Sequence, residues 1–158
     1  MSNHKQLSTS LIMGPEYANL YGNVHGGEIM KIMDNTAGAA AAHFVRGHVV
    51  TARVDEIQFL RPVHMGDFVT CTGQVAYVGR TSIEIYLTVD VENLLVQDSS
   101  ARALEAFFTL VAIGADGRPT PVPAYTPETE QEKALHEHVR LRREFYETRR
   151  EEAKAHLR

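Results

Sequence analysis

The sequence contains one cysteine, Cys71, no tryptophan and no long apolar run among its 158 residues. One cysteine excludes an intrachain disulfide and a cysteine-based metal cluster, and it fits a reducing cytoplasm. No stretch reaches the roughly 18 apolar residues of a membrane span, and residues 1–5 lack the apolar core of a signal peptide. We therefore expect a cytoplasmic protein that has no membrane partner.

The sequence also lacks an excess of positive charge and the common nucleotide motifs. The formal net charge is −4 and the sequence pI is about 6.0, so no basic field is present to hold nucleic acid. Gly22 and Gly27 have the glycine spacing of a phosphate loop, but Glu28 and Ile29 replace the required Lys and Ser/Thr. Gly-x-Ser-x-Gly and Gly-x-Gly-x-x-Gly are absent, and no metal site is predicted.

The residues that are present predict one α+β domain with a C-terminal extension. Apolar residues recur nearly all round a helix over 28–45, which predicts a buried helix. Segments 50–60, 68–78, 83–92 and 102–113 have strand character, a short strand precedes the helix, and a change of phase near Asp55 and Glu56 predicts a bulge. We expect an antiparallel sheet wrapped around a central helix in residues 7–118.

Residues 119–158 form a proline-rich exit and a charged C-terminal helix in this prediction. Thr126 is the expected N-cap, Pro127 the first helical residue, and 128–158 the helix. Such charge runs normally face water, so we interpret the tail as a solvated helix lying on a neighbour.

Asp34 is the first candidate for chemistry, because it lies on the predicted buried helix. Its neighbours along the helix are apolar or small: Met30, Ala37, Gly38 and Ala41. A carboxylate on such a stripe loses solvation, and perturbed carboxylates of this kind occur at functional sites. The alternative is an exposed ion pair between Asp34 and Lys31.

A loop rich in hydrogen-bond donors precedes the helix. Gly26 and Gly27 leave backbone N–H groups uncovered at a helix N-terminus, where they can bind a developing negative charge. Asn23 adds an amide and His25 a polar wall. The alternative is that these residues form an ordinary turn and helix start. A lone carboxylate behind such a turn suits hydrolysis of an activated acyl group.

The segment Asn23-Val-His-Gly-Gly-Glu-Ile-Met-Lys-Ile-Met-Asp34 resembles the signature of the hotdog-fold acyl-CoA thioesterases. Further similarities are Val50-Thr-Ala-Arg-Val-Asp55, Gly79-Arg-Thr-Ser82, Ala106-Phe-Phe-Thr-Leu-Val111, Pro121-Val-Pro123 and Pro127-Glu-Thr-Glu-Gln-Glu-Lys133. The resemblance implies a hotdog fold, hydrolysis of fatty acyl-CoA to free acid and CoA, and no cofactor apart from the CoA of the substrate. It also implies a dimer and a hexamer that is a trimer of dimers.

The resemblance implies a site at the dimer interface, with Asn23 of one subunit facing Asp34 of the other. Asp34 is then general base or nucleophile, and the N–H of Gly27 or Gly26 binds the oxyanion. The remaining substrate-binding candidates are His25, Gly26, Thr51, Arg80, Thr81 and Ser82. Arg80 is the first choice for the CoA phosphates, ahead of Arg53 and Arg61, although an exposed hairpin arginine is the alternative.

Two other functions remain open on the same fold. One is an acyl-CoA sensor that binds its ligand without releasing thiol. The other is a different hotdog enzyme, either a hydratase acting on enoyl-CoA or a thioesterase for aromatic acyl-CoA.

Overall fold

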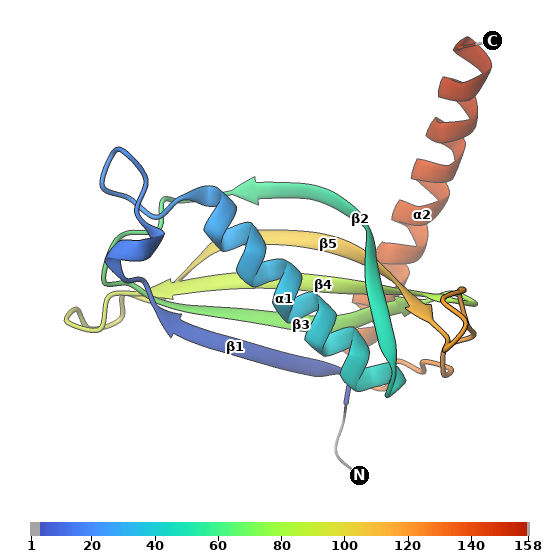
Figure 1. Ribbon diagram of the computed structural model, residues 1–158, viewed down its shortest axis with the longest axis horizontal. Coiled ribbons are helices and arrows are strands. Elements are labelled where there is room, and N and C mark those ends of the chain that lie inside the picture. Colours follow the sequence, from blue (N-terminus) through green and yellow to red (C-terminus); the bar gives the residue numbers. More distant parts are fainter. Residues whose placement is uncertain (1–3, 158) are drawn as a thin grey trace. The chain divides into compact units, whose positions relative to one another are not determined.

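The computed structural model describes residues 4–157, which form two compact units, 4–123 and 124–157. In the first unit, five antiparallel strands form one sheet, and a helix lies on one face of it (Figure 1). The strand order is β1 (Gln6–Ile12), β3 (Phe68–Val78), β4 (Ser82–Glu92), β5 (Ala101–Ile113) and β2 (His48–Phe59). The expected α+β layout is confirmed. The predicted boundary after residue 118 lies five residues before the division between the units.

The core lies between this sheet and helix α1 (Gly26–Val45). Side chains at alternate positions of β4 are fully buried: Ile83, Ile85, Leu87 and Val89. The helix lies close to the sheet at Gly73 on β3, where a Cβ atom would lie 3.2 Å from the Cβ of Ala40. Small residues at this crossing therefore set the distance between α1 and the sheet.

Only one side of α1 is buried in the single chain, which corrects the prediction of a helix buried all round. The buried residues are Ile29, Ile32, Met33, Thr36, Ala37, Ala40 and Ala41. Met30 is 43% exposed, and Asp34 is exposed. The physical reason is that the sheet of one chain covers a single face of the helix and leaves the opposite apolar residues in solvent.

The predicted strands are all present, with two differences. β1 extends over seven residues, Gln6–Ile12, where the sequence predicted a short strand before the helix. β2 contains the expected irregularity between Asp55 and Gln58, with Glu56 at a φ of 40°, and a second shift between Thr51 and Arg53. Both shifts lie on a strand at the edge of the sheet, where such bulges are common.

Helix α2 (Glu130–His156) begins later than the sequence predicted. Thr129, not Thr126, is the N-cap: its hydroxyl accepts a hydrogen bond from the N–H of Glu132, and the Glu132 carboxylate accepts one from the N–H of Thr129. This reciprocal capping box satisfies two backbone donors, an advantage that Thr126 and Pro127 do not provide.

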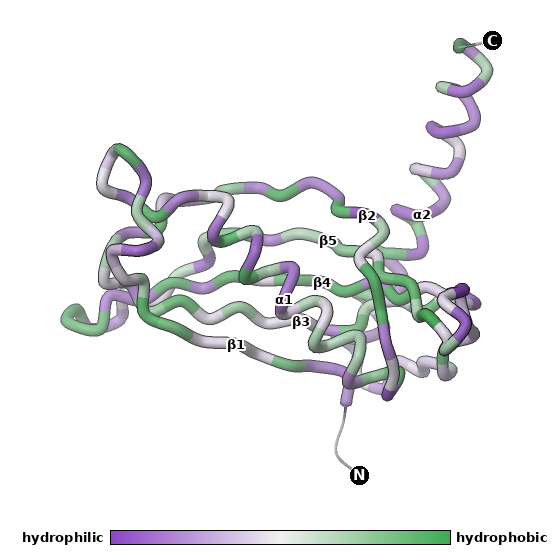
Figure 2. The backbone as a smooth tube through the Cα atoms, viewed as in Figure 1, coloured by the Kyte–Doolittle hydropathy of each residue, from purple (hydrophilic) through white to green (hydrophobic). Residues whose placement is uncertain are grey.

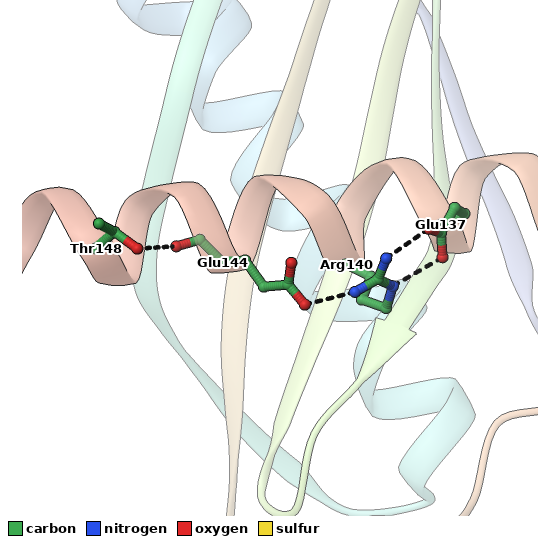
Figure 3. Close-up of polar contacts among 4 residues, drawn as sticks. All are labelled: Glu137, Arg140, Glu144 and Thr148. Carbon is green, nitrogen blue, oxygen red and sulfur yellow. Dashed lines mark hydrogen bonds and ion pairs between the residues drawn. The ribbon is translucent and has the colours of Figure 1, made fainter.

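The residues of α2 are largely hydrophilic (Figure 2). Arg140 forms ion pairs with Glu137 and Glu144 along the helix, and the hydroxyl of Thr148 donates to the carbonyl of Glu144 (Figure 3). These pairs at i,i+3 and i,i+4 spacing support an exposed helix. Among the described residues, neither helix combines the length and hydropathy needed to cross a membrane.

Candidate active site

Asp34 forms a direct contact with β2. The hydroxyl of Thr51 donates a hydrogen bond to Oδ1 of Asp34 at 2.7 Å. Lys31, the alternative partner, lies 4.0 Å from Glu28 instead. The expectation that apolar neighbours bury Asp34 is wrong for the single chain, because Asp34 and Thr51 are both exposed. The structure thus places a carboxylate, fixed by one hydroxyl, on the open side of α1.

The two elements that carry this pair also expose apolar side chains, and β2 is an edge strand. Val50, Val54 and Phe59 on β2 are each about half exposed, as is Met30 on α1. An edge strand also presents a row of N–H and C=O groups that have no partner strand. The open side of α1 and β2 therefore has the character of a surface that another protein chain covers.

The N-terminus of α1 is capped by a histidine. His25 is the N-cap residue, and its Nδ1 accepts a hydrogen bond from the N–H of Gly27 at 2.9 Å. The predicted oxyanion donor at Gly27 therefore already has an acceptor in this chain. In the part of the chain that the structure describes, the N–H of Gly26 has no protein acceptor. Gly26 also leaves space for Phe59, whose ring would lie 3.2 Å from a Cβ at position 26.

Asn19 is a further candidate residue that the sequence pattern did not single out. Its Oδ1 accepts hydrogen bonds from the N–H groups of Tyr21 and Asn23, at 2.9 and 3.1 Å. These bonds fix the orientation of the amide and leave its NH₂ group as a donor. A cavity of about 190 Å³ next to this loop is lined by Asn19, Asn23, Val24, Gly26, Ile29, Phe59, Pro62 and Val63. The available signal was the pattern Asn-x-x-Gly at a turn.

The predicted residues fall into two groups in one chain. Asn23, His25, Gly26 and Gly27 lie at the start of α1, whereas Asp34 is eight residues after Gly26. A helix rises 1.5 Å per residue, so these positions are about 12 Å apart along its axis. One chain therefore does not place its own Asp34 against its own Gly26 amide.

The turn formed by Arg80, Thr81 and Ser82 lies at the same end of the sheet as Thr51, the partner of Asp34. Val111 on β5 is the register partner of both Val50 on β2 and Ser82 on β4. Neighbouring strands are about 4.8 Å apart, so Ser82 is about 10 Å across the sheet from Val50. The side chain of Arg80 is exposed, and its carbonyl accepts a hydrogen bond from the N–H of Val122.

Cys71 is unsuited to nucleophilic chemistry. It is fully buried on β3, and burial raises the pKa of its thiol to about 11. The thiol is therefore neutral at physiological pH, as expected for a cysteine of the core. In residues 4–157, no group of three or more His, Cys, Asp and Glu side chains is arranged to hold a metal ion.

Comparison with known proteins identifies the family of this chain. Residues 21–96 match the thioesterase superfamily. The rat cytosolic acyl coenzyme A thioester hydrolase is 39% identical over 131 residues, which are 82% of this chain and 34% of that protein. An uncharacterized acyl-CoA thioester hydrolase of Bacillus subtilis is 36% identical over 84% of this chain and 76% of its own length. The chain belongs to the hotdog-fold acyl-CoA thioesterase family. It spans about a third of the length of its mammalian relatives.

Solved structures confirm the hotdog fold. An apo-hexameric acyl-CoA thioesterase has a TM-score of 0.87 and 33% identity, over 91% of this chain and 92% of that one. The Staphylococcus aureus acyl-CoA hydrolase, in complex with butyryl-CoA, CoA and CoA disulfide, has a TM-score of 0.86 and 27% identity, over 96% and 92%. In mutant structures of this hydrolase, alanine replaces an asparagine, an aspartate 15 positions later, or a threonine a further 17 positions on.

Proposed function

We propose that this protein hydrolyses acyl-CoA thioesters at a site shared between two copies of the chain. The observation that carries the proposal is the hydrogen-bonded pair of Asp34 and Thr51. These residues are 17 positions apart, and Asn19 precedes Asp34 by 15. Both spacings equal those of the asparagine, aspartate and threonine that were replaced in the S. aureus hydrolase.

This spacing favours Asn19 over Asn23 as the asparagine of the site. Asn23 precedes Asp34 by 11 positions. Its backbone N–H donates a hydrogen bond to the side-chain Oδ1 of Asn19. Asn19 also has its amide oriented by two hydrogen bonds and lines the cavity beside Gly26. Asn23, which lines the same cavity, is the second candidate.

The position of β2 at the edge of the sheet supports a site built from two copies. β2 is an edge strand of 12 residues, and a second copy can pair with it antiparallel around a two-fold axis. Pairing centred on the strand places Thr51 opposite Glu56 of the partner subunit. Asp34 then approaches the Phe59 end of the partner's β2, where the partner's Gly26 and Asn19 lie. The two-fold axis generates a second, identical site.

The residues at such a site account for thioester hydrolysis. Asp34 removes a proton from water, the water oxygen forms a bond to the carbonyl carbon, and the carbonyl oxygen becomes negatively charged. Asn19 and a backbone N–H at the helix terminus stabilise that charge. The C–S bond then breaks, and the thiolate of CoA receives the proton from Asp34. General-base catalysis contributes roughly 10²–10⁴-fold, and one oxyanion donor about 10²–10³-fold.

The exposed Arg80, with Thr81 and Ser82, is our candidate for the CoA phosphates, because a guanidinium pairs well with phosphate. The reaction requires no cofactor apart from the CoA of the substrate. Hexameric relatives support further assembly of dimers into a hexamer. We further propose that the acyl groups are fatty acyl chains. We also propose a cytoplasmic location, which the name of the rat cytosolic relative supports.

A free-thiol assay across acyl-CoA chain lengths tests this function. We expect thiol release by the wild type and losses of about 10²-fold or more in kcat for Asp34→Asn and Asn19→Ala. Asn23→Ala should be less affected than Asn19→Ala. Binding of acyl-CoA without thiol release would indicate a sensor, and hydration of enoyl-CoA without thiol release would indicate a hydratase. Either result would contradict the proposal.

A further inference from the structure

The large apolar side chains that residues 4–123 expose fall into two groups. Those of α1 and β2, described above, lie on the open side that the proposed dimer covers. The others lie on turns and strand ends at one end of the sheet (Figure 1): Ile12, Leu20, Tyr21, Leu60, Leu94, Leu95 and Val96. Single exposed apolar residues are ordinary, but a set confined to one end indicates an interaction surface.

The segments that carry this second group lie next to one another. Asn23 forms a β-bridge with His64, which joins the turn at 19–23 to the loop at 60–67. This loop and the hairpin loop at 93–100 share a cavity of about 340 Å³, lined by Arg61, Pro62, His64, Asp67, Val91, Glu92, Asn93 and Ser99. The three segments therefore form one surface, which we call the loop end.

The hairpin loop presents its apolar residues in a fixed shape. The side chain of Asn93 accepts a hydrogen bond from the N–H of Leu95 at 3.0 Å. The hydroxyl of Ser99 accepts a bond from the N–H of Asn93 and donates one to its carbonyl. Leu95 is 96% exposed, and the tip between β4 and β5 is apolar (Figure 2). An ordered loop thus holds apolar side chains in water, which is unfavourable unless a partner covers them.

The turn at 19–23 connects the loop end to the proposed active site. Leu20 and Tyr21 are almost fully exposed and directly follow Asn19. The N–H of Tyr21 donates to Oδ1 of Asn19, so the position of Tyr21 sets the orientation of the Asn19 amide. A Cβ at Gly22 would meet no atom within 4 Å, so the turn is open on this side in the single chain. A partner that packs on Leu20 and Tyr21 would hold the amide in place.

The charges of the loop end favour a second copy of the chain over a lipid surface. Arg61 and Asp98 are both exposed, and neither forms an ion pair within residues 4–157. Two copies that face each other across a two-fold axis can pair the Arg61 of each with the Asp98 of the other. Basic residues normally accompany a lipid-binding segment, whereas residues 92–100 contain Glu92 and Asp98 but no Lys or Arg.

The symmetry of the proposed dimer orients its two loop ends for a larger assembly. The β2 strands pair antiparallel, so the loop ends of the two chains point in opposite directions along the joined sheet. Each dimer can therefore contact two others, and three dimers close a ring. Two of the similar solved structures are described as hexameric, an acyl-CoA thioesterase and a thioesterase of Yersinia pestis.

We propose that the loop end is the contact between dimers in the hexamer, and that the neighbouring dimer covers Leu20 and Tyr21 and thereby holds the Asn19 amide in its catalytic orientation. The second half of this inference rests on the proposed hydrolysis. Leu20 and Tyr21 are then positioning residues, which act on the substrate only through Asn19. An isolated dimer binds acyl-CoA but hydrolyses it slowly, because a donor to the developing negative charge is misplaced.

Sedimentation velocity of the full chain tests the surface without reference to activity. Leu95→Asp places a charge in the contact and should lower the particle mass to one third, that of a dimer, whereas Leu95→Met should keep the hexamer. Because Leu95 is exposed, both variants should fold, which circular dichroism verifies. Leu141→Asp, at an exposed position of α2, is the matched control and should also keep the hexamer. A folded Leu95→Asp hexamer, or dissociation by Leu141→Asp alone, would overturn the inference.

Two further measurements separate the remaining outcomes. A wild type that sediments as a dimer and binds phosphatidylcholine vesicles through Leu95 would assign the loop end to a membrane and overturn the inference. In the free-thiol assay, the kcat of the Leu95→Asp dimer should fall at least about tenfold with little change in KM. Full kcat in that dimer would overturn the role of the neighbouring dimer. Absence of thiol release by the wild-type hexamer would contradict the hydrolase, whereas the sedimentation result would still identify the contact.

Discussion

Gly73 controls how closely α1 approaches the sheet, and replacing it by alanine should destabilise the fold. The added Cβ would lie 3.2 Å from the Cβ of Ala40, 3.3 Å from Cγ2 of Ile85 and 3.4 Å from Cδ2 of Leu87. The leucine methyl can move, but the Cβ of Ala40 is fixed to the helix backbone, so α1 itself must shift. Overpacking of this kind costs about 1–3 kcal/mol, and the lower chain entropy of unfolded alanine returns about 0.4–1 kcal/mol. We expect a net loss of about 1–2 kcal/mol.

Urea denaturation followed by circular dichroism measures this loss, and Ala40→Gly is the matched control. Ala40→Gly alone should cost about 1 kcal/mol, because glycine is a poor helix residue. In the double variant Gly73→Ala/Ala40→Gly, the methyl group moves from the helix to the strand and the crowding is relieved. Its loss should therefore be smaller than the sum of the two single losses by about 1 kcal/mol. Full stability of Gly73→Ala, or simple additivity in the double variant, would refute the reasoning.

Three further predictions concern the site and the core. Thr51→Val should lower kcat about tenfold, because the carboxylate of Asp34 loses its 2.7 Å hydrogen bond. Thr51→Ser keeps the hydroxyl and should retain activity. Equal kcat values for the two variants would contradict this prediction. Arg80→Ala should raise KM for CoA esters far more than for pantetheine esters, and equal effects would argue against a phosphate contact. Burial raises the pKa of Cys71 from 9.0 to about 11, so the thiol stays protonated to a higher pH in the folded state than in the unfolded chain. The free energy of unfolding should thus fall by about 2 kcal/mol as the pH rises from 9 to 11. Cys71→Ala should lack this part of the slope in urea titrations, and identical slopes would contradict the prediction.

The sequence was sufficient for the architecture because hydrophobic periodicity reports local burial. Alternation of apolar and polar residues over 83–92 predicted the strand β4. The change of phase near Asp55 predicted the bulge in β2. The N-cap of α2 was also encoded, in the pattern Thr129-x-x-Glu132, but proline at position 127 suggested an earlier start.

The environment of the site was harder to predict, because it depends on contacts between distant segments. The exposure of Asp34 follows from how much of α1 one sheet can cover, which periodicity does not report. The bond between His25 and Gly27 depends on a side-chain rotamer, so the free amide expected at Gly27 was a reasonable but incorrect inference. Asn19 was not among the predicted candidates, because the orientation of its amide depends on a turn in which two backbone N–H groups bond to its Oδ1.

Subunit complementation tests the shared site most directly. Asp34→Asn and Asn19→Ala proteins, each nearly inactive, are mixed under conditions that allow verified subunit exchange. If Asp34 and Asn19 of one site come from different chains, each mixed dimer contains one site with both substitutions and one with neither. Random exchange makes half of the dimers mixed, so thiol release should recover to about a quarter of the wild-type rate. Verified exchange without recovery would place both residues of each site in one chain and contradict the account.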